Sequence, residues 1–271
     1  MRSLHPQLVA EGAPPAFASV LVGIDSSPEA LEATRQAAIL AQGPVSLVAS
    51  YDLTEALVGG VPNPAVPAFL DEPPLVEAAT RSLTEAQAAA GMVETTTDIG
   101  RGRPWDVLLA EIEREHHTLV AVGSHGTGRL RGIVMGSTAT ELIHKAPCSV
   151  LVARSAGEQF PSRIVVGIDG SDESLVAYRV ADELAQRFNA RLVPLVASLD
   201  GDIDTDAVRR LVPRRVRKVL DAPVEALVKA SADADLIIVG SRGLQGIKAL
   251  GSVSERVAHE AGSSVLIVRS R

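Results

Sequence analysis

The sequence contains a single cysteine, Cys148, so no disulfide bond can form within the chain. Cysteine usage of this kind is typical of proteins kept in a reducing compartment. The first residues carry one arginine and three prolines by Pro15, and they include no long apolar run. We therefore expect neither a secretory signal nor a membrane-spanning segment, and we predict a cytoplasmic protein.

Positive charge is scarce as well. The chain has 26 lysines and arginines against 33 aspartates and glutamates, which gives a formal net charge of −7. A general nucleic-acid-binding protein needs a basic face that releases counterions from the phosphate backbone. The one local exception is a run of arginines at positions 209, 210, 214, 215 and 217, which is typical of a solvated surface. We expect no nucleic-acid partner.

Two common catalytic motifs are missing. The sequence holds no G-x4-G-K-[ST] phosphate loop and no G-x-S-x-G nucleophile turn. The adjacent His116 and His117 would project about 100° apart on a helix, which does not suit shared metal coordination. We predict no catalytic residue and no metal site made by the protein alone. Cys148 and Trp105, the only tryptophan, are expected to serve in packing.

What the chain does contain is an internal repeat. Four blocks return in the same order: 19–27 as 163–171, 47–52 as 195–200, 120–126 as 237–243, and 149–154 as 264–269. Asp25 and Gly123 are 98 positions apart while Asp169 and Gly240 are 71 apart, so the second copy is 27 residues shorter in its middle. We predict two related domains, 17–154 and 162–271, joined by a polar linker at 155–161.

Each repeat alternates short Val/Ile/Leu runs with longer segments rich in Ala and Glu. That alternation indicates βαβ units around a parallel sheet, and near-continuous apolar strands indicate a sheet covered on both faces. In the first repeat we predict strands at 19–24, 45–50, 92–98, 118–122 and 149–153. We predict helices at 28–41, 75–90, 104–116 and 137–145.

Glycines recur at fixed spacing after the fourth predicted strand. The pattern is G-x2-G-x9-G-S, formed by Gly123, Gly126, Gly136 and Ser137. Glycine tolerates positive φ and allows a ligand to approach the backbone, and the N-terminus of a helix favours anions. The pattern therefore predicts a phosphate loop, with a nucleotide as the first ligand to consider. The alternatives are turn formation by the glycines and helix capping by Ser137.

Asp25 is the second candidate feature. Ser27 and Pro28 resemble an N-cap followed by a first-turn proline, which places Asp25 at the carboxyl end of a strand. Open α/β sheets bind ligands at that edge, where the winding of the sheet reverses. Asp25 would then bind a ribose or base while the glycine loop holds phosphate. The alternative is a carboxylate that only caps a helix.

These residues resemble a known family. The pairing of V-G-I-D-x-S near the start of each repeat with G-x2-G-x9-G-S in the first is similar to the universal stress protein family in its tandem two-domain form. The resemblance covers about residues 17–154 and 162–270. It implies an α/β fold of two Rossmann-like domains, each an open five-stranded, mainly parallel sheet of order 3-2-1-4-5 with helices on both faces. It also implies that the fifth strands, 149–153 and 264–268, pair within the chain as a pseudo-dimer, to which a homodimer could be added.

The resemblance further implies ATP as cofactor, with any Mg²⁺ carried on its phosphates, and a regulatory or protective role under stress or growth arrest. Carried over by position, the nucleotide-binding residues are Asp25, Ser50, Gly123, Gly126, Arg129, Gly136, Ser137 and Thr138, and His125 lies in the same loop. A second site would comprise Asp169, Ser198, Gly240, Gly243, Gly251 and Ser252.

The second glycine loop departs from the family pattern. Its spacer, 244–250, holds seven residues in place of nine, which removes up to about 7 Å of reach. Triphosphate binding in the second half is therefore left open. Two other functions remain as alternatives, a weak ATPase or other nucleotide-using enzyme and a ligand-free scaffold. In the leading hypothesis, the ATP-loaded and empty states differ in the proline-rich segment 53–74.

Overall fold

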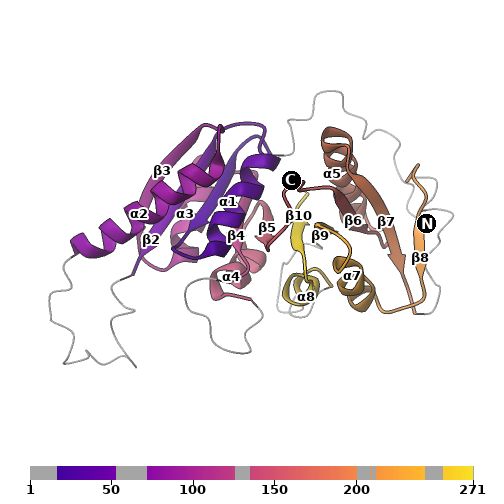
Figure 1. The fold of residues 1–271 in the computed structure, drawn as a ribbon. Helices are drawn as coiled ribbons and strands as arrows, with labels where there is room; N and C mark the ends of the chain where they lie inside the picture. Colours follow the sequence, from indigo (N-terminus) through magenta and orange to yellow (C-terminus); the bar gives the residue numbers. More distant parts are fainter. Residues whose placement is uncertain are drawn as a thin grey trace, which may run out of the picture.

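The computed structural model of the chain describes residues 17–52, 72–125, 135–199, 208, 212–241 and 253–270. The strands of these residues form one ten-stranded sheet in the order β3-β2-β1-β4-β5-β10-β9-β6-β7-β8 (Figure 1). Neighbouring strands are parallel except β5 and β10, which meet antiparallel at the centre. Each half therefore has the predicted order 3-2-1-4-5, and the predicted pairing of the two fifth strands is confirmed.

The elements of the first half are β1 (Val20–Ile24), α1 (Pro28–Leu40), β2 (Val45–Tyr51), α2 (Glu72–Ala90), β3 (Thr95–Arg101), α3 (Pro104–Glu115), β4 (Leu119–Gly123), α4 (Ser137–Lys145) and β5 (Ser149–Ala153). Those of the second half are β6 (Arg163–Gly167), α5 (Asp172–Phe188), β7 (Arg191–Ala197), β8 (Arg217–Val219), α7 (Pro223–Ser231), β9 (Leu236–Gly240), α8 (Val253–Glu260) and β10 (Ser264–Val268).

Two apolar cores cover the two faces of the sheet, because side chains of a strand alternate between faces. Val20 and Val22 of β1 belong to one core and Leu21 to the other. Helices α1, α2 and α5 contribute to the first core, and α3, α4, α7 and α8 contribute to the second. The expectation of helices on both faces is confirmed, and Cys148 is buried in the second core as predicted.

The third strand differs from the prediction. We expected it at 92–98, but β3 spans Thr95–Arg101. Gly91 ends the preceding helix with φ of +67°, and Met92 is fully exposed in the turn that follows. The strand begins instead at a run of threonines, whose branched side chains suit an edge strand with a solvated face.

The two halves hold each other through a reciprocal pair of arginines that follow the central strands. Arg154 extends into the second half, where Nη2 donates to the carbonyl oxygen of Ala258 in α8 at 2.5 Å. Arg269 extends into the first half, where Nη2 donates to the carbonyl oxygen of Ile143 in α4 at 2.5 Å. Burial lowers the pKa of Arg154 to about 10 and also lowers that of Arg269. The carbonyl groups near the C-terminus of the last helix in each half thus accept hydrogen bonds from an arginine of the other half.

Candidate functional site

A cavity of about 320 Å³ lies at the carboxyl ends of β1 and β4. The chain passes from β1 outward to β2 and β3, then returns to place β4 on the other side of β1, so the winding reverses at this point. This is the position where open α/β sheets bind ligands. The lining residues are Gly23, Ile24, Asp25, Ser27, Ala30, Val48, Ser50, Pro104, Trp105, Val107, Leu108, Val122, Gly123, His125, Gly136, Ser137, Thr138 and Ala139.

The structure therefore brings most of the predicted residues together. Asp25, Ser50, Gly123, Gly136, Ser137 and Thr138 line the cavity, and so does His125. Gly126 and Arg129 lie outside the described residues, as does segment 53–71 of the proline-rich region.

Asp25 has a structural role at the edge of this cavity. Its Oδ1 accepts hydrogen bonds from the backbone N–H of Ser27, at 2.9 Å, and from the Ser27 hydroxyl. The Ser27 oxygen in turn accepts from the backbone N–H of Ala30 at 3.2 Å and caps helix α1, whose first residue is Pro28. The predicted N-cap is confirmed, and the carboxylate is fixed in orientation by the helix that follows it.

Helix α4 points its N-terminus at the cavity. Its N-cap is Gly136, not Ser137, and within the described residues no side chain caps the helix. The first-turn N–H groups of such a helix lack intrahelical partners and carry the positive end of the macrodipole. Ser137 and Thr138 place their hydroxyls at the same end. The combination suits an anion.

The structure gives Gly123 a packing role that its motif did not indicate. It belongs to strand β4, and its φ is outside the positive range. A β-carbon at this position would lie 2.7 Å from Cβ and 2.8 Å from the carbonyl carbon of Glu29, in the first turn of α1. Gly123 is therefore required because helix α1 packs directly against the strand. The tolerance of glycine for positive φ is therefore not used at this position, and the assignment of Gly123 to a nucleotide site stays a prediction.

Trp105 is the main lining residue that the sequence did not identify. It stands with Pro104, Val107 and Leu108 at the start of α3 and forms an apolar wall of the cavity. The guanidinium of Arg103 lies 4.9 Å from the centre of the tryptophan ring system. The sequence contained a usable signal, because Pro104 begins a helix shortly after a strand and so places the helix start at the ligand-binding edge.

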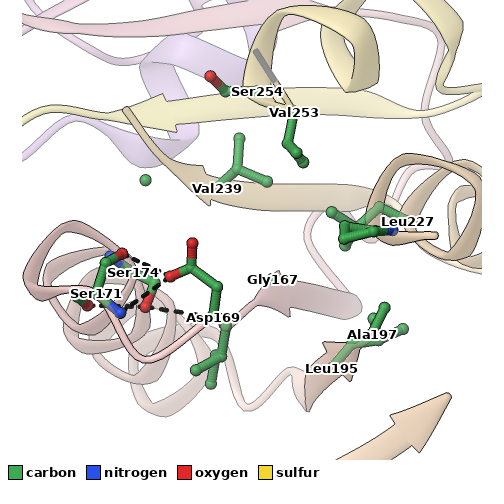
Figure 2. A pocket seen from close by; sticks show the side chains of 13 residues that line it. Gly167, Asp169, Ser171, Ser174, Leu195, Ala197, Leu227, Val239, Val253 and Ser254 are labelled. Carbon is green, nitrogen blue, oxygen red and sulfur yellow. Dashed lines mark hydrogen bonds between the residues drawn. The ribbon is translucent and has the colours of Figure 1, made fainter. Parts of the chain in front are cut away.

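The second half has a larger cavity, of about 490 Å³, at the equivalent edge (Figure 2). Asp169 and Gly240 line it as predicted, together with Ser254 and Val253 of α8. Gly243, Gly251 and Ser252 lie outside the described residues. Among the described residues that line this cavity, Ala197 is present and Ser198 is not.

The position of Ser198 follows from strand register. Gly23 pairs with Val48 in the first half, and its equivalent Gly167 pairs with Leu195 in the second. The counterpart of Ser50 is therefore Ala197, although the sequence blocks L-V-A-S align Ser50 with Ser198. A slip of one residue in a strand moves each side chain to the opposite face. The assignment of Ser198 by block matching is corrected to Ala197.

Fold and cavities together define a tandem Rossmann-like α/β protein with a candidate ligand site in each half. The model of the universal stress protein family matches residues 16–154 and 203–269. The universal stress protein Rv2623 of Mycobacterium tuberculosis is 30% identical over 288 residues, covering 92% of this chain and 96% of that protein. A universal stress protein of Mycolicibacterium smegmatis is 29% identical, covering 93% and 97%. The chain belongs to the universal stress protein family.

The fold has a close structural counterpart as well. The crystal structure of a universal stress protein from Archaeoglobus fulgidus superposes with a TM-score of 0.71 at 20% identity, covering 93% of this chain and 96% of the other. At that identity the likeness concerns the fold. Within the described residues, no helix has the length and apolar character needed to cross a membrane. The same residues contain no cluster of three histidine, cysteine or acidic side chains suited to a metal.

Proposed function

We propose that the chain is an adenine-nucleotide-binding regulatory or protective protein, and that ATP occupies the first cavity. The division into domains 17–154 and 162–271, with a linker at 155–161, belongs to the same proposal. The observation that carries it is the arrangement around the first cavity, where an oriented carboxylate, an apolar wall and a helix N-terminus that no described side chain caps face one space.

Each part of the cavity suits one part of the ligand. The wall that contains Trp105 offers an apolar face for a base, and Asp25 offers a hydrogen-bond acceptor for a ribose hydroxyl. The N-terminus of α4, with Ser137 and Thr138, offers donors and a positive dipole end for phosphate. Any Mg²⁺ would be carried on the phosphates. A cytoplasmic location is proposed with it, since the single cysteine suits a reducing compartment.

Isothermal titration with ATP tests the proposal through Ser137→Asp. Ser137 is exposed at the first position of α4, so a carboxylate there should keep or raise helix stability while repelling phosphate. We expect one nucleotide per wild-type chain and loss of binding in the variant, with a melting temperature equal to or above that of the wild type. If a folded Ser137→Asp chain bound ATP with wild-type affinity, the N-terminus of α4 would not be part of the nucleotide site.

The repeat supplies a matched control for the carboxylate. Asp25 and Asp169 make the same pair of hydrogen bonds, to Ser27 and Ser171 respectively, so their substitution by asparagine perturbs both caps alike. Asp25→Asn should weaken ATP binding, and Asp169→Asn should leave it unchanged. Equal effects of the two variants would indicate a general structural cause.

A release assay for inorganic phosphate addresses the enzymatic alternative. We expect a flat time course with purified wild-type protein and ATP. Steady turnover that disappears with Ser137→Asp would show that the same cavity hydrolyses its nucleotide.

A further inference from the structure

The second cavity differs from the first in chemistry as well as in size. Figure 2 shows Asp169 with Ser171 and Ser174 on one side, and Leu195, Ala197 and Leu227 on the other. Among the described residues that line it, Asp169 is the only ionisable one. Its Oδ1 accepts from the backbone N–H of Ser171 at 3.0 Å and from the Ser171 hydroxyl at 2.5 Å. One carboxylate in an otherwise largely aliphatic lining suits an uncharged ligand that donates a hydrogen bond.

The described part of the helix that faces this cavity differs from α4 at two positions near its N-terminus. By position, Val253 of α8 replaces Thr138, and Glu255 replaces Thr140. Val253 is 41% exposed and presents an aliphatic side chain to the cavity. Glu255 puts a carboxylate into the first turn of α8, with Oε1 3.0 Å from Nε2 of His144. A carboxylate in the first turn interacts favourably with the positive end of the helix dipole, so this helix N-terminus favours an added anion less than that of α4 does.

The wall opposite has lost its aromatic ring. Pro104 begins α3 and Pro223 begins α7, so Trp105 corresponds to Val224 and Val107 to Ala226. Smaller side chains at these positions leave a wider space, in keeping with a cavity of about 490 Å³ against about 320 Å³. Small-molecule sites of this kind are mostly apolar with a few polar groups that fix orientation.

We propose that the second cavity binds an uncharged, largely apolar small molecule that carries a hydrogen-bond donor for the Asp169 carboxylate, and that it excludes nucleotide polyphosphates. The two halves of the repeat then have different ligands. This inference does not depend on ATP being the ligand of the first cavity.

N-phenyl-1-naphthylamine is a suitable probe, since it is uncharged, apolar and carries one N–H donor. Its fluorescence should rise saturably with one probe per chain. Ala197→Leu fills the second cavity and should weaken the probe's affinity at least about tenfold. The register-matched control Ser50→Leu fills the first cavity and should leave probe affinity unchanged.

Competition with ATP completes the test. ATP should fail to displace the probe from the Ser50→Leu chain. Displacement by ATP from that chain, absence of saturable binding to the wild type, or equal loss in both variants would overturn the proposal. If Ala197→Leu fails to fold, Val253→Asp serves in its place, because this exposed position lines the same cavity and a charge there should also weaken probe binding.

Discussion

Gly123 and Gly240 hold the same place in the two halves, and in both the missing β-carbon lets a helix approach a strand. A β-carbon on Gly240 would lie 2.5 Å from the carbonyl oxygen of Glu173 at the start of α5. The corresponding contact of Gly123 is with Glu29 of α1. Because backbone atoms are involved, neither contact can be relieved by rotating a side chain. Substitution of these glycines therefore perturbs the packing of helix against strand at the edge of each cavity.

Gly123→Ala and Gly240→Ala should each lower the free energy of unfolding by about 1–3 kcal/mol, because the first turn of a helix must move. Urea denaturation measures the change. Gly157→Ala is the control, since a β-carbon there meets no atom within 4 Å. Wild-type stability in Gly123→Ala would contradict the packing account of this glycine.

His117 gives the fold a dependence on pH. The side chain is buried, its Nδ1 lies 2.8 Å from the Ser19 hydroxyl oxygen, and Nε2 lies 3.8 Å from Glu111. Burial lowers the pKa of His117 below its ordinary value of 6.5, in spite of the opposing carboxylate of Glu111. Well above pH 6.5, His117 is neutral in both the folded and the unfolded chain. Below it the unfolded chain binds a proton that the folded chain does not, so stability falls as pH falls.

His117→Asn should therefore reduce the loss of unfolding free energy between pH 7.5 and pH 5.5, although it lowers stability at pH 7.5 through poorer packing. Urea titrations at the two pH values measure both effects. An identical loss in variant and wild type would exclude His117 as a source of the dependence.

At the scale of elements, each half opens with the same strand-to-helix turn. The Ser27 oxygen accepts from the N–H of Ala30, and the Ser171 oxygen accepts from the N–H of Ser174 at 3.3 Å. Each serine also donates its hydroxyl to the aspartate two residues before it. The turn thus caps a helix and orients a carboxylate at the cavity at once.

Ser27→Ala and Ser171→Ala should each cost about 1 kcal/mol of stability, the usual contribution of an N-cap. Only Ser27→Ala should also weaken ATP binding, because it removes one of the two hydrogen bonds from Ser27 that orient the Asp25 carboxylate. Calorimetric titration of both variants provides the comparison. Equal ATP affinity in the two variants would show that the Ser27 cap does not contribute to nucleotide binding.

Elements with strong local signals could be predicted from the sequence, whereas the exact start and register of some strands could not. The N-cap at Ser27 rests on a side chain next to the turn, and the start of α4 at Ser137 follows a glycine at the N-cap; both were predicted correctly. The start of β3 and the register of Ala197 depend on hydrogen bonds to a neighbouring strand, which no local pattern reveals. Trp105 was assigned to packing because its place on the cavity wall depends on how α3 lies on the sheet.

At the scale of the whole molecule, the repeat forms one continuous sheet whose two central strands bind each other. Since β5 and β10 are paired within the chain, this edge is not available to a second copy. A homodimer remains a prediction and would need another surface. The arginines at the junction connect the halves through the same helices that face the cavities, because Arg154 holds α8 and Arg269 holds α4.

Arg154→Met should increase amide hydrogen exchange mainly in α8, and Arg269→Met mainly in α4, because each removes hydrogen bonds to carbonyls of the opposite half. Mass spectrometry of peptides after exchange locates the change. Arg114→Met is the control, since its ion pairs lie within and beside α3. Increased exchange confined to the half that carries the substitution would contradict the contacts of each arginine with the opposite half.

The central claim is that one of two homologous halves binds a nucleotide. Native mass spectrometry of the purified chain with excess ATP counts bound nucleotides directly. The account predicts one nucleotide per wild-type chain and none on Ser137→Asp. No bound nucleotide on the wild type, or two on each chain, would contradict it.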